Sequence, residues 1–81
     1  MNKIKAIKER VHVLSELLDL MDEIQDELAM EKKLKKLYGL HWDDKKLKEY
    51  HDLTERFEFQ LKSNYRTCQG ICETIKELID L

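Results

Sequence analysis

A helical spacing of apolar residues runs along most of this chain and is interrupted once. Residues 39–44 read Gly-Leu-His-Trp-Asp-Asp, and they separate two long segments in which apolar residues recur every three or four positions. This spacing gathers apolar side chains on one face of a helix. Proline is absent, and a short connection makes successive helices antiparallel neighbours. The sequence therefore predicts an all-α, two-helix antiparallel hairpin in one domain, 1–81, with helices at about 2–38 and 44–80 and a turn at about 39–43.

The turn carries residues that end one helix and start the next. Gly39 can adopt the left-handed conformation that commonly ends a helix, and Asp43 is a favourable N-cap for the second helix. With Asp43 as the cap, Trp42 precedes it and Leu47 occupies the fourth helical position, which is the spacing of a hydrophobic staple. These residues predict that the boundary between the helices is fixed by local contacts.

The apolar pattern differs between the two helices. In the second helix a single row keeps the three-four rhythm without a skip, and it consists of Leu47, Tyr50, Thr54, Phe57, Leu61, Asn64, Cys68, Ile71, Ile75 and Leu78. The first helix carries two adjacent rows, one of Ile4, Ile7, Val11, Leu14, Leu18 and Met21 and the other of Val13, Leu17, Leu20 and Ile24. We expect the first of these rows to form the seam of a coiled-coil-like pair.

The second row of the first helix predicts a further partner. Two helices share only one seam, so Val13, Leu17, Leu20 and Ile24 need cover from another chain. Ordering the chain also costs on the order of 120 kcal/mol of conformational entropy, which a lone hairpin does not offset. We expect a homodimer in the form of a four-helix bundle with these four residues at the dimer interface, and a hairpin docked on another protein is the alternative.

Charged residues support the antiparallel pairing. Folding the chain about residues 41–42 sets opposite one another those residues whose numbers sum to about 83. The basic start of the first helix, 3–10, then faces the acidic end of the second, 73–80, and the acidic middle of the first faces Arg56, Lys62 and Arg66. Each exposed pair contributes only about 0.2–1 kcal/mol, but together the pairs disfavour a parallel arrangement.

Composition and the absence of known motifs argue against several classes of protein. Charged residues make up 40% of the chain but the net charge is -2, so overall charge favours neither nucleic acid nor an anionic membrane. No apolar run approaches the roughly 20 residues of a membrane span, and the first residues lack the apolar core of a signal peptide. Two cysteines do not indicate a disulfide scaffold, and no phosphate-loop or His-Glu metalloprotease motif occurs. We expect a cytoplasmic protein without membrane contact, enzymatic activity or a cofactor.

A non-catalytic protein of this kind works by binding. Seven acidic residues lie between positions 11 and 31 without one lysine or arginine among them. A surplus of one sign suits a basic partner, although it also serves solubility. Phe59 falls on the outward side of the second helix, where it either anchors a partner or packs on a sister subunit. We expect an adaptor, inhibitor or assembly subunit that binds another protein through Phe59, Glu16, Asp19, Glu23 and Asp26.

Two alternatives remain open from the sequence. Lysines cluster on both sides of the turn with aromatic residues among them, and such surfaces hold phosphates and stack bases. This nucleic-acid hypothesis rests on Lys32, Lys35, Trp42, Lys45 and Lys48, which otherwise form a solvated helix end. Zinc is the second alternative, because Cys68 and Cys72 lie one helical turn apart and His12 comes near them in the antiparallel pairing. The simpler role for both cysteines is that of small core residues.

Overall fold

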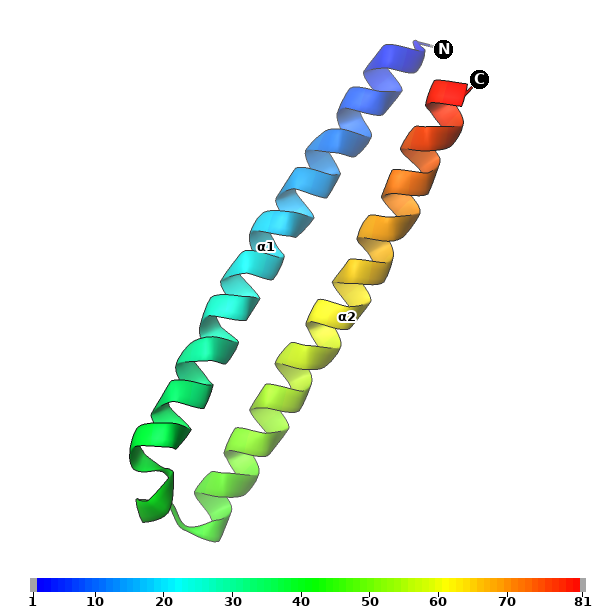
Figure 1. Cartoon of the computed structure of the whole chain (residues 1–81). Helices are drawn as coiled ribbons and strands as arrows, with labels where there is room; N and C mark the ends of the chain where they lie inside the picture. Colours follow the sequence, from blue (N-terminus) through cyan, green and yellow to red (C-terminus); the bar gives the residue numbers. More distant parts are fainter. Residues whose placement is uncertain (1, 81) are drawn as a thin grey trace.

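The chain forms a long, thin helical hairpin (Figure 1). The computed structural model describes residues 2–80, with α1 at Lys3–Tyr38, one 3-10 turn, η1, at Gly39–His41, and α2 at Asp44–Asp80. The two helices lie side by side and run in opposite directions, so the start of α1 and the end of α2 lie at the same end of the hairpin. The Cα atoms span 59 × 14 × 14 Å. The predicted all-α antiparallel hairpin is confirmed.

Side chains cap the start of both helices. Asn2 accepts a hydrogen bond from the backbone N–H of Lys5 at 3.2 Å, and this bond caps α1. At the start of α2 the carboxylate of Asp43 accepts from the backbone N–H of Lys46 at 2.8 Å, and the Asp43 carbonyl accepts from Leu47 N at 3.0 Å. These bonds satisfy donors that the first helical turn leaves without a partner. The prediction that Asp43 is the N-cap of α2 is confirmed.

The prediction of a left-handed Gly39 is wrong. Gly39 has φ -59° and ψ -28°, which is right-handed helical backbone, and no residue between 2 and 80 has a positive φ. The chain instead tightens into η1, and the N–H of Trp42 donates to the Gly39 carbonyl at 3.2 Å. A Cβ on Gly39 would lie 3.1 Å from Lys35 Cγ, so close packing, rather than a special φ, accounts for glycine at this position.

Trp42 packs against Tyr50 of α2. Its ring centroid lies 5.8 Å from that of Tyr50, one helical turn beyond Leu47, and the Lys46 ammonium lies 5.5 Å from the Trp42 centroid. Trp42 itself is half-buried and extended, with φ -82° and ψ 140°. The aromatic pair and the stacked cation fix the direction in which the chain enters α2.

The hairpin seam follows the predicted row of α2 but not the predicted row of α1. All ten residues of the α2 row are buried or half-buried. In α1 the seam runs between the two predicted rows, so Ile4, Val11 and Leu18, expected in the seam, are exposed. The α1 residues that are buried or half-buried in the half away from the turn are Lys3, Ala6, Ile7, Arg10, Leu14, Leu17 and Met21.

The core of the hairpin is thin. Its buried residues are Ala6, Ile24, Thr54 and Cys68, each with 7% of its surface exposed, and no large side chain is fully buried among residues 2–80. Cys68 Sγ lies 3.9 Å from Met21 Sδ across the seam. A seam of half-buried side chains contributes much less apolar burial than a globular core of the same length.

Residues that meet across the seam lie slightly later in α2 than predicted. Met21 contacts Cys68, and the Lys35 ammonium lies 4.9 Å from the Tyr50 ring centroid. The numbers of these pairs sum to 89 and 85, whereas the predicted value was about 83. Because η1 adds a helical turn before the chain reverses, the point of reversal lies beyond residues 41–42.

The ion pairs expected between the start of α1 and the end of α2 do not form. Arg10 is half-buried, and its guanidinium donates to the Ala6 carbonyl at 3.1 Å. Across the described part of the chain only two ion pairs form: His12 with Glu16 at 3.0 Å within α1, and Lys32 with Glu58 at 3.8 Å between the helices. The stability of the hairpin therefore depends on its seam and caps and very little on charge pairing.

We expect Asp43→Ala to lower the free energy of unfolding by about 0.5–2 kcal/mol, because the first turn of α2 loses its side-chain acceptor. Asp43→Asn keeps a capping oxygen and should stay close to the parent protein. Thermal melts followed by helical circular dichroism measure both effects. Equal melting curves for Asp43→Ala and the parent would show that the cap does not stabilise the boundary.

Candidate functional site

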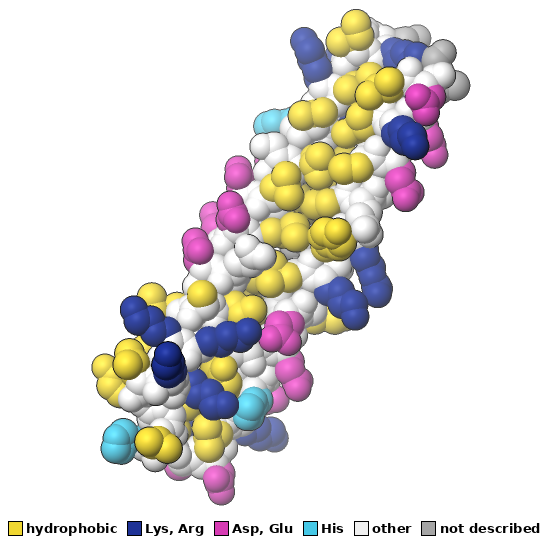
Figure 2. Space-filling model, in the orientation of Figure 1, with side chains coloured by type: hydrophobic (Ala, Val, Ile, Leu, Met, Phe, Trp, Pro, Cys, Tyr) yellow, Lys and Arg dark blue, Asp and Glu magenta, His cyan; other side chains and the backbone are white. Residues whose placement is uncertain are grey.

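Six exposed side chains with apolar character lie along one side of the hairpin seam, in the half of the molecule away from the turn. In each helix they recur at every seventh position, and this spacing keeps them on one flank. Because the helices are antiparallel, the two flanks lie side by side. We call this set the terminal face, and it consists of Ile4, Val11, Leu18, Tyr65, Cys72 and Ile79. Figure 2 shows an apolar band that covers both helices in this half.

Part of the terminal face borders a groove of about 540 Å³ between the two helices. The groove opens to solvent, and most of the side chains around it are apolar, which is typical of grooves that receive an apolar helix face. Gln69 and Glu73 lie at its border. The apolar residues and cysteines that line it are Leu14, Leu18, Met21, Tyr65, Cys68 and Cys72.

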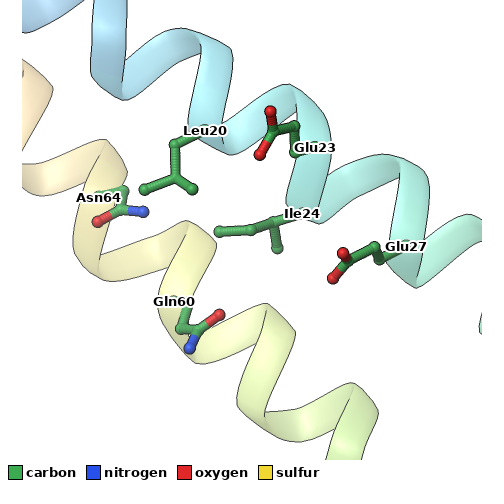
Figure 3. Close-up of a pocket in the computed structure, with 6 residues that line it drawn as sticks. All are labelled: Leu20, Glu23, Ile24, Glu27, Gln60 and Asn64. Atoms are coloured by element: carbon green, nitrogen blue, oxygen red, sulfur yellow. The ribbon is translucent and has the colours of Figure 1, made fainter.

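A more polar groove lies on the opposite side of the seam, near the middle of the hairpin (Figure 3). It is lined by Leu20, Glu23, Ile24, Glu27, Gln60 and Asn64. The two glutamates come from α1 and the two amides from α2, so polar groups of both helices surround a small apolar floor. We call this the acidic groove. Its carboxylates suit a basic or hydrogen-bonding contact better than an apolar helix.

The structure divides the four residues that were predicted to form the dimer interface. Leu17 is half-buried and Ile24 is buried, so both belong to the hairpin's own seam. Val13 and Leu20 are exposed on the flank that carries the acidic groove. A second chain can therefore reach Val13 and Leu20, whereas α2 already covers Ile24.

The acidic residues assigned to a partner lie on the outside of α1. Glu16, Asp19, Glu23 and Asp26 are all exposed, and Figure 2 shows acidic side chains along the outer edge of α1. Glu23 also borders the acidic groove, and Glu16 is held by His12 of the same helix. Glu16, Asp19 and Asp26 therefore lie on an exposed acidic surface of α1, and Glu23 lies where this surface meets the acidic groove.

Phe59 is the most exposed aromatic side chain described, with 72% of its surface accessible. It borders a shallow groove together with Lys62, Ser63, Arg66 and Thr67 on the outside of α2. The structure therefore places Phe59 beside basic residues and does not bring it to the acidic surface of α1. The two parts of the predicted partner site belong to different helices.

The lysines of the nucleic-acid hypothesis lie near the turn, in the half where Figure 2 shows basic side chains crossing both helices. Lys35 stacks on Tyr50 and Lys32 pairs with Glu58, so two of the four are engaged within the hairpin. Lys45 and Lys48 are exposed. Trp42, the proposed stacking residue, is half-buried against Tyr50 and Lys46. Its ring is thus less open to a base than the sequence suggested.

The three residues of the zinc hypothesis are not gathered. Cys68 is buried against Met21, Cys72 is exposed on the terminal face, and both thiols are free. His12 is exposed and contacts Glu16 on the outside of α1. Within residues 2–80 no three His, Cys, Asp or Glu side chains lie in a group that could hold a metal ion.

No protein-family model matches this chain, and no curated protein or solved structure is significantly similar to it. In the part of the chain that the structure describes, neither helix has a stretch long and apolar enough to cross a membrane.

Proposed function

We propose that this chain is a small, non-catalytic helical interaction protein that works as a homodimeric four-helix bundle. The exposed apolar side chains of the terminal face are the observation that supports this proposal. Within residues 2–80 no large side chain is fully buried, and a row of apolar side chains lies exposed to water on one side of the seam. Covering that row with further helices adds apolar burial that the hairpin alone lacks.

A dimer built on the terminal face leaves the outside of α1 free for a partner. The acidic surface of Glu16, Asp19, Glu23 and Asp26 is exposed on α1, with Glu23 beside the acidic groove on the flank opposite the terminal face. The basic residues beside Phe59 lie on the other helix. One-signed surfaces steer and select partners of opposite charge. The protein then acts as an adaptor, inhibitor or assembly subunit toward a second protein with a basic surface.

An affinity pull-down from the source cells, with the tagged chain as bait, tests this function. Reversing the charge at Asp19, Glu23 and Asp26 to lysine should abolish capture of the partner, because attraction becomes repulsion. The matched control reverses Glu49, Asp52 and Glu55, which are equally exposed carboxylates on α2, and should retain capture. Capture that survives both reversals would reduce the acidic surface to a role in solubility.

The same bait distinguishes a protein partner from nucleic acid. Binding to phosphates weakens steeply between about 50 and 200 mM salt, because counterions compete for the same contacts. We expect the captured partner to be protein. Recovery of nucleic acid that is lost at the higher salt, and lost again when Lys45 and Lys48 become glutamine, would replace this proposal with the nucleic-acid hypothesis.

A further inference from the structure

We propose that the terminal face is covered by a second copy of this chain whose turn lies at the same end, so that each α1 packs beside the partner's α2. This inference rests on the proposed dimer and specifies how its two hairpins are arranged. Two hairpins related by a two-fold axis can point the same way, with the axis along the hairpin, or opposite ways, with the axis across it.

The position of the terminal face excludes one opposed arrangement. The apolar row runs only from the chain ends to Leu18 and Tyr65. Nearer the turn, two further steps of seven residues lead from Leu18 to Lys32 in α1 and from Tyr65 to His51 in α2. Lys32 and His51 therefore lie on the same flank as the terminal face. Two opposed hairpins overlapping along their full length would therefore place apolar side chains against these polar ones, and Figure 2 shows basic side chains in that half.

The other opposed arrangement overlaps only the two terminal halves, and it buries little surface. A hairpin two helices wide, at about 10 Å per helix, offers about 600 Å² over half of its length and about 1,200 Å² over all of it. A stable interface takes about 800 Å² from each partner. Only hairpins that point the same way match apolar to apolar along the terminal half and also use the full 59 Å length.

Charge also favours hairpins that point the same way. Each α1 then meets the partner's α2 in the register that it has with its own α2, so Lys8 and Arg10 lie near the level of the partner's acidic end, 77–80. The acidic middle of α1, 19–27, lies beside the partner's basic stretch 62–66. Near the turn, the Lys32–Glu58 pair lies on the docking flank, where each ion gains a second neighbour of opposite charge.

Spin labels at the tip of the hairpin test this arrangement. Leu40 is fully exposed in η1, so a ketone-bearing unnatural amino acid at position 40, coupled to a hydroxylamine spin label, places the label outside the packed helices and leaves Cys68 and Cys72 unchanged. Sedimentation of the labelled protein confirms the mass, and pulsed dipolar spectroscopy measures the distance between the two labels. With both turns at one end, helix spacing of about 8–10 Å sets a label distance of about 15–35 Å. In the half-overlapped opposed dimer, a rise of 1.5 Å per residue separates the labels by more than about 60 Å.

The outcomes separate this inference from the proposed function. A dimeric mass with the short distance supports both. A dimeric mass with the long distance overturns the arrangement and leaves the dimer intact. A monomeric mass for the labelled protein and for the unsubstituted chain overturns the dimer, and the arrangement with it.

Discussion

Leu18→Glu is expected to convert the dimer into monomers. Leu18 lies at the centre of the terminal face, 51% exposed in the hairpin, and borders the apolar groove between the helices. The two-fold axis places two new carboxylates in the interface, and each buried unpaired ion costs several kcal/mol. Since every 1.4 kcal/mol is tenfold in affinity, the dissociation constant should rise by more than about a thousandfold. Sedimentation velocity over a concentration series measures it.

Leu20→Glu is the matched control for this substitution. Leu20 is the same residue type, two positions along α1 and 44% exposed, but it lies on the acidic-groove flank. Because the new carboxylate joins Glu23 and Glu27, circular dichroism first checks that the helices persist. The control should dimerise with nearly the affinity of the parent. Dissociation by Leu20→Glu with retention by Leu18→Glu would place the dimer interface on the opposite flank.

Ile24→Ala is expected to be the most damaging single truncation within the hairpin. Ile24 is the one large apolar side chain that is buried among residues 2–80, with 7% of its surface exposed. Truncating a buried isoleucine to alanine costs about 2–5 kcal/mol, because apolar burial is lost and a cavity remains. Urea unfolding at one fixed protein concentration, followed by circular dichroism, measures the loss.

Leu37→Ala serves as the comparison for Ile24→Ala. Leu37 is an exposed apolar residue of α1 outside the terminal face, so its truncation should change the free energy of unfolding by less than about 0.5 kcal/mol. Equal losses for the two variants would mean that Ile24 is no more buried in solution than Leu37. The seam described above would then be in the wrong place on α1.

The difference between the two helices explains how far sequence could predict the seam. In α2 one unbroken row, from Leu47 to Leu78, leaves a single choice of face, and that face is the one that packs. In α1 two apolar rows lie side by side, and either one satisfies helical spacing. The packed face is a compromise that takes Leu14 and Leu17 from different rows, and local spacing alone does not select it.

At the turn, too, the sequence predicted one feature and missed another. The cap at Asp43 depends on a residue type and a spacing of three, so sequence predicted it. Gly39 keeps right-handed helical backbone because the chain continues into η1, which no local rule for a C-terminal glycine contains. The position of Trp42 against Tyr50 likewise depends on where the chain reverses.

The terminal face was missed because its residues were divided among other roles. Ile4, Val11 and Leu18 were assigned to the hairpin seam, Cys72 was assigned to the alternative zinc site, and Tyr65 and Ile79 lie outside the row predicted for the second helix. The signal was nevertheless present, because both sets recur at every seventh position. Such spacing keeps each set on one flank of its own helix, and the groove lined by Leu18, Tyr65 and Cys72 shows that the two flanks share a side.

Sedimentation equilibrium of the unsubstituted chain at micromolar concentration tests the central claim most directly. If the terminal face is covered by a second copy, the measured mass is about twice the 9.8 kDa of the chain, and the melting temperature rises with protein concentration. A mass of 9.8 kDa for a chain that remains fully helical and melts cooperatively would contradict the dimer, because the hairpin would then be stable with its terminal face in water.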